Sequence, residues 1–341
     1  MKNYLLQLAE KKSFTENEMK EAIDNILCEE VSESEIAAFL MGLKSKGETV
    51  EEITGIVRAL KENTLSFKKK FPNVLDNCGT GGDGSSSFNV STTSAFVIAG
   101  AGIPVAKHGN RSISSKTGSA DVLEKLGINL DLAPERIEEV IDEVGIAFLF
   151  APNVHPKLKK IGMVRKQLRI PTVFNFIGPL TNPIDLDFQL LGVYRRDLLP
   201  VFAEVLNKLG RKRAIVLNGA GYMDEASLQG ENHLSILENG TITKYTFSPE
   251  EVGLPHYDNS EIKGGDSREN AEILVRVLKG ERGAYRDTVL LNAGLGIYTT
   301  GKAVSIQDGI NQAREVIDSG AAYEKLQQLI EKTAAGQREA I

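Results

Sequence analysis

Up to about residue 65, apolar side chains recur at helical spacing in segments that each begin with a capping signature. Capping boxes pair a Ser or Thr with a Glu three residues later: Thr15 with Glu18, Ser32 with Glu35, and Thr49 with Glu52. Apolar positions three and four residues apart follow each box. The N-terminal region is therefore predicted to be a small, entirely helical domain.

After Pro72 the pattern changes to short β-branched runs that alternate with helical stretches. The predicted strands cover residues 74–77, 104–107, 146–149, 213–217 and 288–291. The predicted helices cover residues 91–101, 119–126, 134–144, 198–209 and 269–278. Such alternation is typical of a largely parallel sheet with helices on both faces. Residues 231–245 interrupt it and predict a β-hairpin, with Gly240 between two short polar strands.

Residues 158–180 return to a helical pattern, which alone does not assign them to a domain. We expect a small helical domain from residues 1–70 together with about residues 160–182, and a large α/β domain from residues 71–159 and 183–341. The central sheet of the large domain is expected to be mostly parallel. The basic run at residues 68–70 fits a linker, since a charge run is more often solvated surface than a binding site.

Composition excludes several classes of protein. Hydrophobic residues make up 41% of the 341 residues and charged residues 25%, which is ordinary for a globular protein. No apolar run approaches the ~20 residues of a membrane helix, and no secretory signal is visible. Cys28 and Cys78 offer neither a disulfide framework nor zinc spacing, so a cytoplasmic location is expected. The net charge of -6 disfavours binding of nucleic acid by bulk electrostatics, so an anion site has to be built locally.

A glycine-rich segment at residues 76–84 follows the first predicted strand and precedes a helix. It contains a G-x-G-x-x-G pattern at Gly79, Gly81 and Gly84, whose accessible backbone N–H groups suit a phosphate. A dinucleotide-binding fold also needs an acidic residue at the end of the next strand, where this chain has Lys107-His108. The nicotinamide hypothesis is therefore disfavoured. Since Asp83 would repel a bare pyrophosphate, a ribose hydroxyl or a bridging cation is expected beside it.

Two further segments favour a phosphate site. Residues 85–94 supply eight polar side chains around a helix start, although a single residue suffices for an N-cap. Residues 107–115 (Lys-His-Gly-Asn-Arg-Ser-Ile-Ser-Ser) place basic and hydroxyl side chains at the C-terminal end of a strand, where parallel sheets bind ligands. With the glycine-rich segment, they can hold two phosphate groups of one ligand.

Asp224 and Glu225 form the remaining candidate site. On a regular strand adjacent carboxylates face opposite ways, whereas in a loop after residues 218–221 both can turn to Mg²⁺. Taken alone, such a pair is usually solvated surface. A polyphosphate site in the same chain favours metal binding.

Together these segments resemble the anthranilate phosphoribosyltransferase family, over nearly the whole chain. The motifs that carry the resemblance are residues 79–83, 107–111, 174–183 (Phe-Asn-Phe-Ile-Gly-Pro-Leu-Thr-Asn-Pro) and 224–225, with 264–266, 269–271 and 291–293. Residues 107–115 are also similar to pyrimidine nucleoside phosphorylases of the same fold, so this motif alone does not separate the two. A non-catalytic nucleotide sensor is a further alternative.

The resemblance implies transfer of the phosphoribosyl group of phosphoribosyl pyrophosphate (PRPP) to the amine of anthranilate, with release of pyrophosphate, the second step of tryptophan synthesis. It implies a requirement for Mg²⁺ and a homodimer formed through the helical domain, with no nucleic-acid or membrane partner. The implied donor contacts are Gly79, Gly82, Asp83, Ser87, Asn89, Val90, Ser91, Thr92, Lys107, His108, Gly109, Asn110, Arg111, Ser112, Ile113, Ser114, Ser115 and Ser119.

The resemblance further implies anthranilate contacts from Gly79, Asn110 and Arg165. It implies metal ligands at Ser91, Asp224 and Glu225, with His108 as a candidate proton acceptor. The chain departs from the family pattern at residues 155–159 and 168–172, where Arg169 and Pro171 stand in a segment that is often Leu-Gly-x-Arg-Thr. It departs again at Tyr222, where a small residue is frequent.

Overall fold

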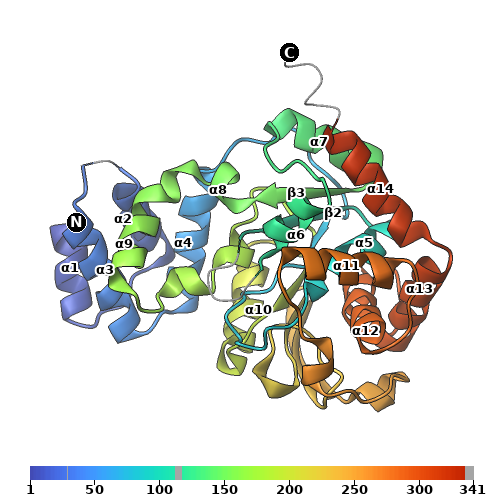
Figure 1. The fold of residues 1–341 in the computed structure, drawn as a ribbon. Coiled ribbons are helices and arrows are strands. Elements are labelled where there is room, and N and C mark those ends of the chain that lie inside the picture. Colours follow the sequence, from blue (N-terminus) through green and yellow to red (C-terminus); the bar gives the residue numbers. More distant parts are fainter. Residues whose placement is uncertain (29, 112–116, 335–341) are drawn as a thin grey trace.

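The structure is a computed structural model that describes residues 1–28, 30–111 and 117–334. Its N-terminal part is a small helical domain (Figure 1). Its helices are α1 (Lys2–Ala9), α2 (Glu16–Ile26), α3 (Glu33–Lys46) and α4 (Val50–Glu62). The predicted capping boxes of α2, α3 and α4 are all formed, with the Ser or Thr side chain and the Glu side chain each accepting from the other residue's backbone N–H. The predicted helix starts are therefore confirmed.

The larger α/β domain is built on one sheet, which has seven strands within the described residues, in the order β3-β2-β1-β4-β5-β6-β7. The strands β3, β2, β1, β4 and β5 run parallel, whereas β6 and β7 form an antiparallel hairpin at one edge. Their bounds are β1 (Leu75–Asp76), β2 (Val105–Gly109), β3 (Ile146–Phe150), β4 (Phe188–Gly192), β5 (Arg213–Asn218), β6 (Asn232–Glu238) and β7 (Thr241–Phe247). The mostly parallel sheet and the hairpin confirm the sequence predictions.

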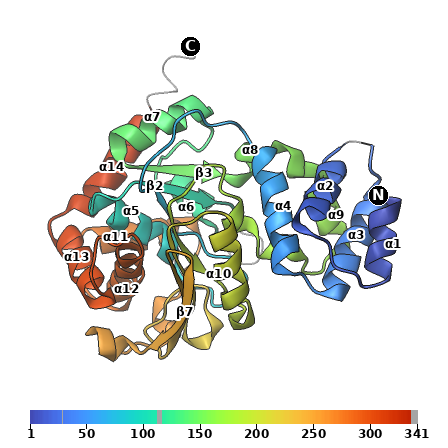
Figure 2. The ribbon, with the colours of Figure 1, turned by 180° about the vertical axis from the view of Figure 1, so that it is seen from behind.

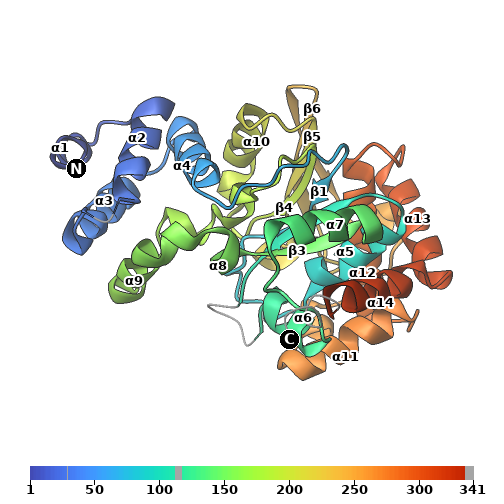
Figure 3. The same ribbon diagram turned by 90° about the horizontal axis from the view of Figure 1, so that it is seen from above.

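Helices cover both faces of this sheet (Figures 1 and 2). The helices that follow the helical domain in the chain are α5 (Val90–Gly100), α6 (Ser119–Lys125), α7 (Pro134–Val144), α8 (Ala151–Val154), α9 (Lys159–Leu168), α10 (Leu199–Lys208), α11 (Ser267–Leu278), α12 (Ala284–Thr299), α13 (Ile306–Asp318) and α14 (Ala321–Ala334). Of these, α9 does not lie on the sheet but packs against α3 of the helical domain, which Figure 3 shows from above.

Side chains of β4 and β5 alternate between two hydrophobic cores because successive residues of a strand face opposite sides of a sheet. Leu190 and Ile215 belong to the core shared with α5, α11 and α12. Leu191 and Val216 belong to a second core, which runs through α10 into the helical domain and includes Phe39. The second core therefore joins the helical domain to one face of the sheet.

The structure differs from the sequence predictions in three places. The strand predicted at residues 288–291 is wrong, because these residues lie inside α12, which is buried almost all round and therefore shows no amphipathic period. Strand β4 was not predicted. Of the helical stretch predicted at 158–180, only α9 is an α-helix, and short 3₁₀ turns at Val173–Asn175 and Gly178–Thr181 follow it around Pro171 and Pro179.

No helix in the described part of the chain combines the length and the apolar character needed to cross a membrane. The linker lysines 68–70 are exposed, and two of them also contact α7: the backbone N–H of Lys69 donates to Glu138 at 2.9 Å, and Lys68 Nζ lies 3.2 Å from Glu135.

The capping box of α4 differs from the others because its glutamate is fully buried. Glu52 accepts from the N–H groups of Phe14 and Thr49, both at 2.9 Å, and pairs at 2.7 Å with Lys46, whose side chain is also buried. We predict that Glu52→Ala lowers the free energy of unfolding by about 3 kcal/mol, because it leaves a buried ammonium group unpaired. Urea unfolding followed by circular dichroism measures this loss.

The control is Glu18→Ala, which removes an exposed capping box of the same type. This change is expected to cost about 1 kcal/mol or less. Equal losses in the two variants would contradict the role of the buried ion pair.

Candidate active site

The glycine-rich segment leaves β1 at the middle of the sheet, where β1 lies between β2 and β4. Here the strand order switches, and ligands of open parallel sheets bind beyond the carboxyl ends of the strands at such a point. The N–H of Thr80 donates to the carbonyl of Gly192 at the end of β4, at 2.9 Å. The N–H of Gly81 donates to Asp224 Oδ2 at 2.6 Å. The structure therefore brings the glycine-rich segment and the acidic pair together.

Asp224 contacts the glycine-rich segment, whereas Glu225 contacts the hydroxyl-rich segment at the start of α5. Glu225 Oε1 accepts from the N–H of Ser91 at 3.1 Å, in the first turn of α5. Burial raises the pKa of Glu225 to about 7, and burial together with the nearby Asp83 and Glu225 carboxylates raises the pKa of Asp224. Both carboxylates therefore lie in a position where a bound cation would favour their ionised form.

The acidic pair does not form a complete metal cage. Within residues 1–28, 30–111 and 117–334, no group of three or more His, Cys, Asp or Glu side chains is arranged to hold a metal ion. Mg²⁺ is commonly bound by one or two carboxylates plus water and substrate phosphates. The donor set at Asp224 and Glu225 fits that mode of binding.

The hydroxyl-rich segment opens α5, as expected. The buried residue Val90 begins the helix, and Ser87 forms an isolated bridge with Lys263. Thr92 is buried, and its Oγ1 has no hydrogen-bond partner among the described residues. Asp83 accepts from the N–H of Ser85 at 3.0 Å and lies close to Asp224. The Asp83 carboxylate therefore lies beside the acidic pair, where the sequence predicted a cation or a ribose hydroxyl.

The basic segment is only partly turned toward this site. Lys107 is buried, and its Nζ lies 3.4 Å from the carbonyl of Asn77, in the glycine-rich segment. Arg111 instead pairs with Asp121 at 2.8 Å and with Glu124 at 2.6 Å, both on α6. Other predicted residues of the segment, Ser112, Ile113, Ser114 and Ser115, lie outside the described residues.

Gly109 and Asn110 connect the basic segment to the start of α6. Ser119 Oγ donates to the carbonyl of Asn110 at 3.2 Å. Gly109 ends β2, and a Cβ at this position would lie 2.5 Å from Ser119 Oγ. Ser119 therefore holds the end of β2, while the Asn110 side chain accepts from the N–H of Arg111 at 2.7 Å.

His108 is buried and uncharged. Its Nδ1 lies 3.1 Å from the carbonyl of Gly178, which can only accept, so Nδ1 carries the proton. Burial and the neighbouring His155 ring lower the pKa of His108 to about 3. His108 Nε2 has no hydrogen-bond partner in the described part of the chain. At neutral pH this nitrogen is a weak proton acceptor.

Arg165 lies on α9, on the helical-domain side of the site. It is half-buried, its guanidinium lies over the Phe174 ring at 5.6 Å from the centroid, and its Nη2 lies 3.4 Å from Asn175 Oδ1. Among the residues that the structure describes, no carboxylate lies within ion-pair distance of Arg165. A half-buried guanidinium without an acid is a candidate site for a carboxylate ligand.

The sequence analysis gave no role to Asp76 and Asn182, which connect the two sides of the site. Both are fully buried, and Asn182 Nδ2 donates to Asp76 Oδ2 at 2.9 Å and to the carbonyl of Ala106 at 2.8 Å. Asp76 Oδ1 also accepts from the N–H of His108 at 3.3 Å. Asp76 stands in the glycine-rich segment and Asn182 in the motif at residues 174–183, but neither position reveals that the two side chains are partners.

Comparison with known proteins agrees with this site. Residues 71–323 match the glycosyl transferase family a/b domain, and residues 2–64 match the glycosyl transferase family helical bundle domain. The chain is 56% identical over 330 residues to an anthranilate phosphoribosyltransferase of Bacillus cereus (strain B4264), covering 97% of each chain. The chain belongs to the anthranilate phosphoribosyltransferase family.

Solved structures of the anthranilate phosphoribosyltransferase family have the same fold. The enzyme from Thermus thermophilus is 40% identical with a TM-score of 0.92, and the match covers 97% of this chain and 99% of that one. The enzyme from Saccharomyces cerevisiae in complex with PRPP and Mg is 26% identical with a TM-score of 0.90, and the match covers 98% and 97%. These relatives favour a phosphoribosyltransferase over the nucleoside phosphorylase alternative.

Gly79 gives a test of how the glycine-rich segment meets the acidic pair. The sequence favours glycine here for close approach of the donor, but a Cβ on Gly79 would first lie 2.6 Å from Asp224 Oδ2. We predict that Gly79→Ala displaces Asp224 and raises both the apparent KM for PRPP and the Mg²⁺ concentration needed for half-maximal activity. A rise of about tenfold corresponds to about 1.4 kcal/mol. Steady-state kinetics at varied Mg²⁺ measure both quantities.

The control variant is Gly162→Ala on α9, where an added Cβ meets nothing within 4 Å. We expect this variant to keep the wild-type Mg²⁺ dependence. An unchanged Mg²⁺ requirement in Gly79→Ala would contradict the contact with Asp224.

Proposed function

We propose that this chain transfers the phosphoribosyl group of PRPP to the amine of anthranilate, with release of pyrophosphate. The observation that carries the proposal is the placement of Asp224 and Glu225 against the N–H groups of Gly81 and Ser91. Carboxylates and backbone N–H groups beyond the carboxyl ends of the central strands suit a polyphosphate bound with a divalent cation. Membership of the anthranilate phosphoribosyltransferase family supports this substrate.

We infer that Asp224 and Glu225 hold Mg²⁺, with Ser91 beside them. The Ser91 N–H donates to Glu225 Oε1 at 3.1 Å, which keeps that carboxylate at the start of α5. When bound, magnesium supplies positive charge next to the leaving pyrophosphate. The yeast relative, solved with PRPP and Mg, supports this assignment.

Displacement of pyrophosphate develops positive charge on the ribose and negative charge on the leaving group. This chain contributes mainly by orientation and electrostatics. We propose that residues 79–83, 87, 89–92, 107–115 and 119 surround the donor. Lys107 places a buried positive charge next to Asn77 in the glycine-rich segment, where it favours binding of the anionic donor.

On the acceptor side, we propose that Arg165 binds the carboxylate of anthranilate, with Asn110 and Gly79 nearby. The 3₁₀ turns at residues 173–181 connect the two sides, because Asn175 contacts Arg165 while the carbonyl of Gly178 accepts from His108. The amine of anthranilate has its own lone pair, so the attack does not require a strong base. We propose His108, which is uncharged and whose Nε2 has no partner among the described residues, as the group that accepts the released proton.

We also propose the domain division into residues 1–70 with about 160–182, and residues 71–159 with 183–341. Packing of α9 against α3 supports it. A homodimer formed through the helical domain follows from the family resemblance alone. A cytoplasmic location is consistent with Cys28 and Cys78, which are both free thiols.

The experiment that tests the function follows anthranilate fluorescence with the purified full-length chain. We expect the fluorescence to be lost only when PRPP and Mg²⁺ are both present, with stoichiometric release of pyrophosphate. Phosphate-dependent cleavage of a pyrimidine nucleoside without consumption of anthranilate would overturn the proposal.

Arg165→Ala tests the acceptor site. Loss of a charge-assisted hydrogen bond costs about 1.5–3 kcal/mol, which corresponds to a fall of about 10- to 150-fold in kcat/KM for anthranilate. The KM for PRPP should stay near the wild-type value, because the proposed donor loops lie on other elements. Steady-state kinetics with each substrate varied in turn measure the split.

The matched control is Lys166→Ala, an exposed neighbour on the same helix. We expect it to leave kcat/KM for anthranilate unchanged. If Arg165→Ala also remains within about twofold of the wild type, then the acceptor carboxylate binds elsewhere.

A further inference from the structure

The C-terminal motifs at residues 264–266 and 269–271 pack against residues 86–89 of the proposed donor site, here called the donor loop. The carbonyl of Ile262 accepts from the N–H of Phe88 at 3.0 Å, and the N–H of Gly264 donates to the carbonyl of Ser86 at 2.9 Å. Ser87 and Lys263 form an antiparallel bridge between these bonds. The segment from Ile262 to Gly265 is therefore paired with the donor loop like a short strand.

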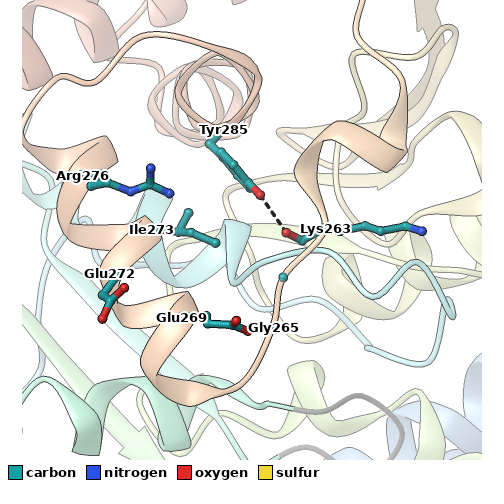
Figure 4. A pocket seen from close by; sticks show the side chains of 8 residues that line it. Lys263, Gly265, Glu269, Glu272, Ile273, Arg276 and Tyr285 are labelled. Carbon is teal, nitrogen blue, oxygen red and sulfur yellow. Dashed lines mark hydrogen bonds between the residues drawn. The ribbon is translucent and has the colours of Figure 1, made fainter.

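Figure 4 shows the outer side of this segment, where it borders a cavity of about 350 Å³. The Tyr285 hydroxyl donates to the carbonyl of Lys263 at 2.8 Å, and the Tyr285 ring packs edge-on against Phe88. Glu272 and Arg276 line the same side and are exposed. Since the exposed outer face of α11 carries Glu272 and Arg276, the contact of this helix with the donor loop comes from its buried face.

Asn270 occupies that buried face and is 3% exposed. Its Oδ1 accepts from the N–H of Gly265 at 2.8 Å, and its Nδ2 donates to Asn89 Oδ1 at 2.9 Å. Glycine is needed at residue 264 because a Cβ there would lie 2.7 Å from Asn270 Oδ1 and 2.9 Å from Phe88 Cα. The glycine thus makes room for the asparagine that reaches the donor loop.

The orientation of both amides follows from one backbone donor. A backbone N–H can only donate, so the atom of Asn270 that faces Gly265 is the oxygen and the atom that faces Asn89 is the nitrogen. The Asn89 atom opposite that nitrogen must then accept, so it is Oδ1. Asn89 Nδ2 is left pointing elsewhere, without a hydrogen-bond partner in the described part of the chain.

We propose that Asn270 is a positioning residue that sets the amide of Asn89 so that its N–H₂ group, and not its oxygen, faces a phosphate oxygen of the donor. The proposal rests on the proposed function, which places residue 89 at the donor. A phosphate oxygen is an acceptor and gains a charge-assisted hydrogen bond from Nδ2, whereas it is repelled by Oδ1.

The test compares Asn270→Asp with Asn270→Ala. The Asp side chain still accepts from the N–H of Gly265, but its second oxygen requires Asn89 to turn its N–H₂ group inward and its oxygen toward the donor. We expect Asn270→Asp to raise the KM and the calorimetric Kd for PRPP by about tenfold or more. The KM for anthranilate and kcat at saturating PRPP should change far less.

Asn270→Ala is expected to weaken PRPP binding less than Asn270→Asp, because Asn89 is then free to turn either way. A purely structural role gives the opposite order, since Ala removes the acceptor of the Gly265 N–H while Asp keeps it. Equal or greater weakening in Asn270→Ala would overturn the proposal. Asn232→Asp, at a buried asparagine that bonds Ser227 and Gly230 instead, shows by its Tm how much a buried carboxylate costs this fold.

A double variant isolates the path through Asn89. If Asn270 acts only by orienting Asn89, then Asn89→Ala with Asn270→Asp binds PRPP no more weakly than Asn89→Ala alone. Additive losses would contradict the proposal. If Asn270→Asp does not fold, then Asn89→Asp must bind PRPP more weakly than Asn89→Ala, because it also turns an oxygen to the donor. Wild-type protein that does not bind PRPP would instead contradict the proposed function itself.

Discussion

Asp224 is packed so tightly against the ends of two central strands that no side chain fits between them. A Cβ on Gly192, the last residue of β4, would lie 1.6 Å from the Asp224 carbonyl oxygen, and Gly79 after β1 is limited by the Asp224 carboxylate. Beyond this contact, Gly81 and Ser91 donate to the acidic pair. The glycine-rich segment, the acidic pair and the start of α5 therefore form one unit, in which a shift of any part displaces the others.

That unit is joined to the acceptor side by buried polar groups. Burial raises the pKa of Asp76 to about 6, even though Lys107 lies near it and Asn182 and the N–H of His108 donate to it. Burying a carboxylate costs free energy unless the carboxylate is hydrogen-bonded, so the fold needs these donors to stabilise Asp76. Asn182 ends the 3₁₀ turns that begin beside Arg165. The hydrogen bond from Asn182 that stabilises buried Asp76 therefore also holds in place the segment between the donor and acceptor sites.

Local sequence signals predicted the elements whose formation depends on nearby residues. The capping boxes formed as predicted, and the hairpin formed around Asn239 and Gly240, which both take the positive φ that such a turn requires. The strand predicted at residues 288–291 was wrong because α12 is surrounded by core on nearly every side, so its burial depends on distant elements. Strand β4, which was not predicted, ends at a glycine whose contact with Asp224 a local pattern does not reveal. The candidate site shows the same limit. Binding of phosphate and Mg²⁺ requires particular residue types, so the sequence indicates the segments of the site. It does not indicate that Asn270 contacts Asn89, which lies 181 positions away in the sequence.

Two departures from the family pattern lie where the chain has to turn sharply beside the site. Arg169 ends α9 with φ of 53°, and Tyr222 precedes the acidic pair with φ of 62°. A left-handed conformation costs a non-glycine residue about 1 kcal/mol or more. At Tyr222 the Arg196 guanidinium over the ring, 4.9 Å from its centroid, offsets part of this cost. The turn at Arg169 leads the chain from α9 to Asn175, which contacts Arg165. The left-handed conformation of Arg169 is therefore explained by the position of this acceptor segment and not by the conformational preference of arginine.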